Sequence, residues 1–393
     1  MARGGGAATA ARIGGAVAAA GLAAVAGAVV ERRARDEPLD VGDPEIGYEH
    51  APSMAMSVLA DDGVRLYAEI DEPVLTGSAE GDRPTVIFSH GYCLSGRSWV
   101  LQRRAVIAAG YRVVVWDQRS HGMSDMAPAE SCTIDQLGAD LRAVVEATAA
   151  DGSIVLVGHS MGGMTMLALA DQEPELFADR VLAAALIGTT AGGRDVVNLG
   201  FGKFLGRFIG SAGPGLLGRL GAHQDRLNTF RRFGRDVEDT LVAKYSFDSP
   251  MSKDVVRFVG DIIFHTPFAV MGNFLPTLEA HDKRSALTAF AGVETLVLNG
   301  LGDLLTPPEH SDDIVRLVPG AEHVVVERAG HLVMLEHPDV VNAQLLELIE
   351  RAERAFAEHV DVAAKPRVRR LVTDVTRLRR RTSKKAPGSS KAS

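Results

Sequence analysis

The stretch "LVGHSMGGMT" (residues 156–165) places one serine between two glycines directly after an apolar run. The run before it, "SIVLV", is short and β-branched and ends abruptly, which is typical of a buried strand. The residues after it, "GGMTMLALADQEPELF", have the apolar spacing of a helix. Ser160 is therefore predicted at a tight strand-to-helix corner, inside a G-x-S-x-G pattern. The glycines leave room for a strained backbone that pushes the hydroxyl out of the sheet. An ordinary Gly-rich turn is the alternative that the pattern alone leaves open.

The segments around this corner alternate between predicted strands and helices. After a polar, Pro-containing linker, "MAMSVLA" and "VRLYAEI" flank "DDG", which is a hairpin signal. Further strands are predicted at 85–91, 111–118, 153–160, 180–188, 294–300 and 322–330. One intervening helix begins at Thr133, where "TIDQ" forms a capping box. The alternation predicts an α/β fold whose mostly parallel sheet is covered on both faces and begins with an antiparallel hairpin.

Polar residues follow several of these strands. In such sheets ligands bind at the carboxyl ends of the strands, which is where Ser160 falls. A second feature, His90-Gly91-Tyr92, comes directly after the strand "TVIFS". Gly91 lets the backbone turn so that the N–H of Tyr92 points over the sheet. Together with the N–H of Met161 at the start of the next helix, it would hold a developing oxyanion.

Two later strand ends carry a candidate acid and a candidate base. Asp303 follows the penultimate predicted strand of the core, where a carboxylate can orient an imidazole and stabilise its charged form. A loop Asp that caps a turn is the alternative. His331 follows the last of these strands and can act as general base for a serine at a neighbouring strand end. It is preferred to His310, His323 and His337 because a glycine precedes it, a strand ends there and an apolar helical run follows.

Five motifs in this order resemble those of the α/β-hydrolase superfamily, and within it the esterase, lipase and cofactor-free haloperoxidase-like branch. The motifs are "HGYCLSGRSW", "VVWDQRSHGMSD", "GHSMGG", "LNGLGDLLTPP" and "AGHLVMLEHP". The resemblance implies that Ser160 is the nucleophile, Asp303 the acid and His331 the base. It places the oxyanion donors on the backbone of Tyr92 and Met161. It implies neither a metal nor an organic cofactor.

The resemblance covers residues 54–190 and 286–357 and includes one departure. Members of the superfamily usually have Gly where this chain has Ser120, in a loop that supports the sheet. Asp117 and Arg119 read as structural residues of that loop. The serine in the G-x-S-x-G pattern also argues against epoxide hydrolysis, because epoxide hydrolases of the superfamily have Asp at that position.

A long insertion separates the two parts of the predicted core, and the resemblance implies that it is a helical cap. Ten of the 14 phenylalanines fall within residues 191–285. Phe201, Phe204 and Phe208 recur at helical spacing and are the candidates for contact with an apolar substrate group. The cap's own core is their alternative role. The breaks "GSAGPG" and "FHTPF" are candidate hinges. The predicted division is a leader (1–35), a linker (36–52), a core (53–190 and 286–357), a cap (191–285) and a basic tail (358–393).

The composition indicates a globular protein, with 46% hydrophobic and 23% charged residues among 393. Cys93 and Cys132 are the two cysteines; they have no metal-ligand spacing and read as free thiols. The net charge of −8 is unevenly distributed, because residues 365–393 hold 11 of the 42 Lys and Arg but one of the 50 Asp and Glu. The acidic remainder has no basic stripe with interleaved aromatics, which argues against nucleic-acid binding.

Both ends of the chain indicate contact with a membrane. Residues 13–30 contain no charged side chain and are just long enough to span a bilayer as a helix. A membrane anchor, a cleaved secretory signal and a low-complexity leader stay open as interpretations. Apolar residues of the tail fall at helical spacing beneath a basic face, which predicts a helix on an anionic membrane surface, with a solvated tail as the alternative. These residues are Val368, Leu371, Val372, Val375 and Leu378. Membrane association would place the catalytic body in the cytoplasm; secretion is the alternative.

Together these features predict a serine hydrolase that cleaves carboxylic esters with an apolar acyl or alcohol part through an acyl-enzyme. Two alternatives use the same triad, namely perhydrolase or haloperoxidase-type chemistry and acyl transfer to an alcohol. A non-catalytic, membrane-associated scaffold is a more distant alternative. The expected partners are a small-molecule or lipid ester and a membrane surface.

Overall fold

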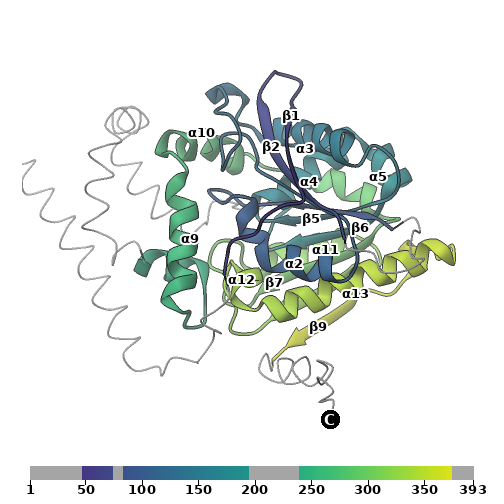
Figure 1. The fold of residues 1–393 in the computed structure, drawn as a ribbon. Coiled ribbons are helices and arrows are strands. Elements are labelled where there is room, and N and C mark those ends of the chain that lie inside the picture. Colours follow the sequence, from purple (N-terminus) through teal and green to yellow (C-terminus); the bar gives the residue numbers. More distant parts are fainter. Residues whose placement is uncertain (1–46, 74–82, 194–238, 374–393) are drawn as a thin grey trace, which may run out of the picture.

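The computed structural model describes residues 47–73, 83–193 and 239–373, which form one open sheet with helices on both faces (Figure 1). Within these ranges the sheet has nine strands in the order β1-β2-β4-β3-β5-β6-β7-β8-β9. The strands are β1 (Met54–Leu59), β2 (Arg65–Asp71), β3 (Thr85–Ser89), β4 (Val113–Trp116), β5 (Ile154–His159), β6 (Val181–Ile187), β7 (Glu294–Gly300), β8 (Glu322–Val326) and β9 (Val368–Val372). β2 pairs antiparallel with β1 and β4, and all other neighbouring pairs are parallel. The predicted hairpin and mostly parallel sheet are confirmed.

Helices cover both faces because alternate residues of a buried strand point to opposite sides of the sheet. Val86 and Phe88 of β3 pack in one apolar cluster with α2 and α13, whereas Ile87 packs in a second cluster with α3 and α4. The helices are α2 (Val100–Ala108), α3 (Ile134–Thr148), α4 (Met161–Gln172), α5 (Pro174–Arg180), α9 (Lys253–His265), α10 (Phe268–Glu279), α11 (Pro308–Leu317), α12 (Val333–Glu336) and α13 (Pro338–Ala357). The short 3₁₀ turns are η1 (Gly96–Trp99), η2 (Ala129–Ser131), η3 (Arg284–Phe290) and η4 (Val362–Ala364).

The direction in which the chain winds reverses at β3. β4 lies on one side of β3, and β5 returns to its other side. The carboxyl ends of β3 and β5 therefore lie next to each other at the switch point, where open α/β sheets bind ligands. β6, β7 and β8 follow outward in chain order, so the ends of all five strands share one edge of the sheet.

Helix α3 begins as the capping box predicts. Thr133 is its N-cap, and the Thr133 hydroxyl accepts a hydrogen bond from the backbone N–H of Gln136 at 3.1 Å. The Gln136 amide does not complete the reciprocal half of the box in this structure. It donates instead to Asp61 Oδ1 at 2.7 Å, which joins the helix to the turn between β1 and β2.

The helix predicted from Val368 to Leu378 is wrong for the residues that the structure describes. Residues 368–372 form strand β9, which pairs in parallel with the edge strand β8. Val375 and Leu378 lie outside the described residues. The spacing of the apolar residues in this short segment is compatible with a helix. Strand β8, however, would otherwise have unpaired backbone N–H and C=O groups at the sheet edge, and the segment pairs with them as a strand.

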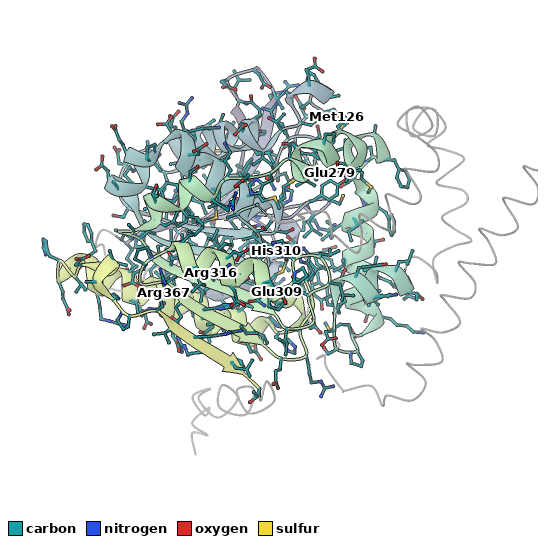
Figure 2. All side chains as sticks on the ribbon, turned by 180° about the vertical axis from the view of Figure 1, so that it is seen from behind. Met126, Glu279, Glu309, His310, Arg316 and Arg367 are labelled. Carbon is teal, nitrogen blue, oxygen red and sulfur yellow. The ribbon has the colours of Figure 1, made fainter. Side chains whose placement is uncertain are left out.

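Opposite charges explain why a basic segment docks at this edge of an acidic body. Arg370 makes ion pairs with Glu322 of β8 and with Glu347 of α13. Arg367, just before β9, donates to the backbone carbonyl of Arg316 at the end of α11 at 2.8 Å, and Figure 2 shows both residues on this side of the molecule. The beginning of the basic tail is therefore part of the folded body.

The described part of the predicted cap is helical. Residues 239–246 form one helix, followed by α9 and α10, which meet at the predicted break "FHTPF". Phe247 and Phe258 are buried in the apolar cluster that also holds α2 and α13. Phe201, Phe204, Phe208 and the predicted hinge "GSAGPG" lie outside the described residues.

Within the described ranges, no single helix is long and apolar enough to cross a membrane. The two cap helices α9 and α10 reach the required length and composition only as a pair, which is bent by 86°. The apolar segment 13–30 lies outside the described residues.

Candidate active site

Ser160 lies at a sharp corner between β5 and α4, with a left-handed φ of 52°. The flanking glycines are required because nothing larger fits. A Cβ on Gly158 would lie 2.6 Å from the backbone of Gly162, and a Cβ on Gly162 would lie 2.1 Å from the carbonyl oxygen of Ser89. The N–H of Ser160 donates to the carbonyl of Ile187 in β6 at 3.0 Å. The G-x-S-x-G pattern thus specifies a strained corner that is held by close backbone packing.

Asp303 and His331 form a direct pair at the neighbouring strand ends. His331 Nδ1 donates to Asp303 Oδ2 at 2.8 Å. Asp303 is 3% exposed, and its Oδ1 accepts hydrogen bonds from the backbone N–H groups of Leu305 (2.8 Å) and Thr306 (2.9 Å). Because a carboxylate only accepts, Nδ1 of His331 carries the proton and Nε2 is left to accept one. This is the tautomer that a general base requires.

The serine corner and this acid–base pair meet around the end of β6. A Cβ on Gly188 would lie 3.5 Å from Asp303 Oδ2 and 3.4 Å from the carbonyl oxygen of His331. Ser160 bonds to the residue directly before Gly188. Among the described residues no hydrogen bond joins the Ser160 hydroxyl to His331, and such catalytic bonds often tighten only when substrate binds.

The loop after β3 passes directly beside the serine. A Cβ on Gly91 would lie 3.2 Å from Ser160 Cβ and 2.6 Å from His159 Nδ1, so this position excludes any side chain. Tyr92 follows in the loop, and Met161 is the first residue of α4. The first N–H groups of a helix have no partner within it and carry its positive dipole end. The loop that carries Tyr92 and the first turn of α4 therefore both lie beside Ser160, and the role of the Tyr92 and Met161 N–H groups as oxyanion donors stays a prediction.

The buried, neutral side chain of His90 helps to hold this loop in place. His90 Nε2 accepts a hydrogen bond from the N–H of Gln118 at 2.9 Å, and Gln118 Oε1 accepts one from the Thr165 hydroxyl of α4 at 2.7 Å. Burial, together with the neighbouring His121, lowers the pKa of His90 well below 6.5. Local sequence does not mark His90 for this supporting role, because its partner Gln118 is 28 residues away in the chain.

Helix α10 of the cap forms an apolar roof next to the serine. Phe274 is fully buried in a cluster with Met161 and Met164 of α4. The Tyr92 hydroxyl donates to the backbone carbonyl of Met271 at 2.5 Å, which ties the loop after β3 to the same helix. Apolar side chains of the cap therefore cover the start of α4, directly after Ser160.

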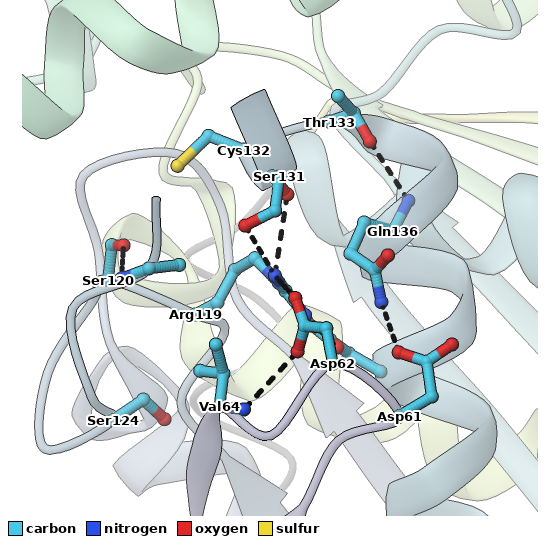
Figure 3. Close-up of polar contacts among 12 residues, drawn as sticks. Asp61, Asp62, Val64, Arg119, Ser120, Ser124, Ser131, Cys132, Thr133 and Gln136 are labelled. Carbon is cyan, nitrogen blue, oxygen red and sulfur yellow. Dashed lines mark hydrogen bonds and ion pairs between the residues drawn. The ribbon is translucent and has the colours of Figure 1, made fainter. Parts of the chain in front are cut away.

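The loop after β4 is structural, as the sequence analysis expected. Arg119 is fully buried and pairs with Asp140 of α3 at 2.6 Å. It also pairs with Asp62 of the β1–β2 turn at 2.6 Å (Figure 3). Ser120 has a left-handed φ of 63°, a conformation that favours Gly, the residue that the resemblance implies at this position. Its hydroxyl accepts a hydrogen bond from Ala127 N–H at 2.9 Å, which partly offsets the strain.

Three further titratable groups, Asp117, Cys93 and Cys132, are buried. Asp117 accepts hydrogen bonds from the N–H groups of Gly96 (2.7 Å) and Met123 (2.8 Å), and burial raises its pKa to about 6. Cys93 and Cys132 are both free and buried, and burial raises the pKa of each thiol. Neither thiol has the exposed, electropositive surroundings of a reactive cysteine. Among the described residues, no cluster of three or more His, Cys, Asp or Glu could hold a metal ion.

The sheet, the serine corner and the paired Asp and His define the α/β-hydrolase class. The family model described as alpha/beta hydrolase fold matches residues 84–338, which is more than half of the chain. The chain therefore belongs to the α/β-hydrolase family, and the resemblance inferred from its motifs is confirmed.

Individual relatives are similar over most of their length. RutD of Pantoea ananatis, a protein named for carbamate hydrolysis, is 26% identical over 279 residues, which cover 70% of this chain and 91% of RutD. The mouse (Mus musculus) sn-1-specific diacylglycerol lipase ABHD11 is 25% identical over 273 residues, covering 68% of this chain and 81% of the lipase. A bromoperoxidase structure from Bacillus anthracis is similar with a TM-score of 0.58 and 21% identity, covering 76% of this chain and 100% of that one.

Proposed function

We propose that this α/β hydrolase is a serine hydrolase that cleaves carboxylic esters with an apolar acyl or alcohol part. The observation that carries the proposal is the 2.8 Å bond between His331 Nδ1 and Asp303 at the strand ends beside Ser160. That bond leaves His331 Nε2 as the proton acceptor on the side away from the acid. Ser160 has a left-handed φ of 52°, which is typical of the strained corner that exposes a nucleophile at the top of such a sheet.

In the proposed reaction His331 Nε2 takes the proton of the Ser160 hydroxyl while the Ser160 oxygen attacks the ester carbonyl. The carbonyl oxygen becomes an oxyanion against the N–H groups of Tyr92 and Met161, each worth about 3 kcal/mol of barrier. His331 then gives the proton to the leaving alcohol, and an acyl-enzyme remains on Ser160. Water, activated by the same His331, releases the acid and restores the serine.

The apolar roof supports an apolar substrate group. Phe274 of α10 packs in one apolar cluster with Met161, which directly follows Ser160, and small-molecule pockets are lined mostly by apolar side chains with a few polar groups. The relative named as a diacylglycerol lipase supports the proposal that the substrate is an ester. The relative named for carbamate hydrolysis supports a chemically similar substrate, a carbamate, as the alternative. Peroxide or an alcohol in place of water would use the same three residues.

Hydrolysis of p-nitrophenyl esters of increasing chain length by the full chain tests this proposal. Turnover should be highest for medium or long chains and fall by at least about 10⁴-fold in Ser160→Ala, because the nucleophile is lost. Ser285→Ala, which changes an exposed serine of η3, is the matched control and should keep wild-type turnover. Turnover that survives in Ser160→Ala would contradict the proposal.

Labelling and product analysis separate the alternatives. A fluorophosphonate should label the wild type but not Ser160→Ala. Labelling without ester turnover would point to another acyl substrate, and products formed with peroxide or alcohol would identify a different acceptor. Absence of both labelling and turnover would support a non-catalytic scaffold.

We also propose that residues 13–30 associate the enzyme with a membrane. Their support is an uninterrupted apolar composition between flanking arginines. Fractionation of cells that express the full chain tests this proposal. Recovery in the soluble fraction with an intact N-terminus would contradict it, and recovery in the medium with a shortened N-terminus would indicate secretion.

A further inference from the structure

His159, the last residue of β5, links the strand of the nucleophile directly to the loop of the base. It precedes Ser160 and is 1% exposed. Its Nε2 donates to the backbone carbonyl oxygen of His331 at 3.0 Å. The two imidazole rings lie with their centroids 4.6 Å apart at an angle of 55°. One side chain thus touches both the backbone and the ring of the proposed base.

The hydrogen bond determines which nitrogen of His159 carries its proton. A carbonyl oxygen only accepts, so Nε2 holds the hydrogen and Nδ1 is left as an acceptor. Nδ1 is buried and has no hydrogen-bond partner among the described residues. It faces Gly91, where a Cβ would lie only 2.6 Å away, so the loop packs closely against it.

A buried acceptor without a partner is destabilising, and native proteins rarely keep one without a reason. An aliphatic side chain at this position would pack against Gly91 without that loss. It would, however, leave the carbonyl of His331 without the donor that His159 provides. His159 therefore keeps one buried nitrogen without a partner among the described residues, while its other nitrogen supplies the donor for the His331 carbonyl.

The backbone around His331 is held from three directions. The N–H of Gly330 donates to Glu336 at 2.6 Å, and the N–H of Leu332 donates to the carbonyl of Ser246 in the cap at 2.8 Å. His159 bonds to the carbonyl end of the peptide group whose N–H, that of Leu332, bonds to Ser246, and it alone of the three comes from the strand that leads to Ser160. Burial, followed by the charge of nearby His331, lowers the pKa of His159 well below 6.5, so it stays neutral while His331 accepts a proton.

We infer that His159 is a positioning residue for the acyl-transfer reaction, which sets His331 against Ser160 by holding the His331 carbonyl. The inference rests on the proposed function, since it assigns His331 the role of base. A displacement of about 1 Å of a reacting group can cost about 10²-fold in rate. Loss of this bond should therefore act on the chemical step and leave substrate affinity unchanged.

The test compares His159→Leu and His159→Gln in the full chain. His159→Leu should lower kcat about 10- to 100-fold at unchanged KM, and it should slow fluorophosphonate labelling of Ser160 to a similar extent. Its Tm should fall less than that of His323→Leu below, because the unpartnered nitrogen is removed together with the hydrogen bond. His159→Gln should recover most of the lost rate, since an amide N–H can replace the donor.

A second buried histidine provides the control for folding effects. His323 is 1% exposed and bonds to Asn299 Oδ1 at 2.8 Å between β7 and β8. His323→Leu should lower the Tm and leave the kcat of the folded enzyme unchanged. Wild-type kcat in His159→Leu would overturn the inference while the proposed function stands. Equal loss of rate and Tm in both His159 variants would also overturn it, because that pattern indicates packing alone. If Ser160 is neither labelled nor active in the wild type, the proposed function itself fails.

Discussion

Replacing Glu336 with Gln should reduce the loss of folding stability that the protein undergoes as the pH rises. Glu336 is 1% exposed. Its Oε1 accepts hydrogen bonds from the N–H groups of Asp248 (3.0 Å) and Ser249 (2.5 Å) and from the Ser249 hydroxyl (2.5 Å). Its Oε2 accepts from the N–H of Gly330 at 2.6 Å. One carboxyl group therefore ties the cap to the loop that carries His331.

The magnitude follows from the burial of this carboxyl group. Burial raises the pKa of Glu336 from 4.5 to about 7, although the hydrogen bonds that it accepts act to lower it. The folded protein therefore holds this proton more tightly than the unfolded chain does. The free energy of unfolding falls as the pH rises through this window, and the loss is complete above it. Each unit of difference between the pKa in the folded and in the unfolded protein is worth about 1.4 kcal/mol, so the total loss of stability is about 3 kcal/mol.

Urea unfolding at several pH values measures this effect. Between about pH 4 and about pH 8 the wild type should lose about 3 kcal/mol more unfolding free energy than Glu336→Gln does. Glu358→Gln, at an exposed position after α13, should follow the wild type throughout. A difference that does not change with pH would refute the reasoning. A wild type that gains stability with rising pH would show that the accepted hydrogen bonds outweigh burial.

Two further substitutions test the oxyanion loop and its support. Gly91→Ala should lower kcat/KM by about 10²- to 10³-fold, because its Cβ would lie 2.6 Å from His159 Nδ1 and displace one oxyanion donor; wild-type steady-state kinetics would argue against that role. Arg119→Leu should lower the unfolding free energy by about 3–5 kcal/mol, since it leaves the carboxylates of Asp140 and Asp62 without their partner. Urea unfolding measures this loss, and a decrease below about 1 kcal/mol would mean that water replaces the guanidinium.

Much of the fold could be predicted because it depends on near neighbours in the chain. Alternation, β-branched runs and helical spacing marked the strands from β1 to β8 and the helix after Ser160. The serine corner followed from the G-x-S-x-G pattern itself, although the atom that excludes a side chain at Gly162 belongs to Ser89 of β3. Asp303 and His331 could be proposed as partners because the ends of parallel strands share one edge of the sheet.

The last strand could not be predicted in this way. Val368, Leu371 and Val372 fit the spacing of a helix as well as that of a short strand. Their conformation depended on the unpaired edge of β8 and on ion pairs between Arg370 and the acidic residues around that edge. Both partners are distant in the chain, so local spacing carries no information about them.

The sequence by itself determined the α/β class, the serine corner and the three residues proposed for catalysis, because each follows from an element's own pattern or from strand direction. Tertiary structure alone decided what surrounds them. It placed Phe274 beside Met161, bonded His159 to the His331 carbonyl and joined Glu336 to the cap. A pattern shows which face of its own element a residue occupies, whereas its partner depends on how the other elements pack against that face.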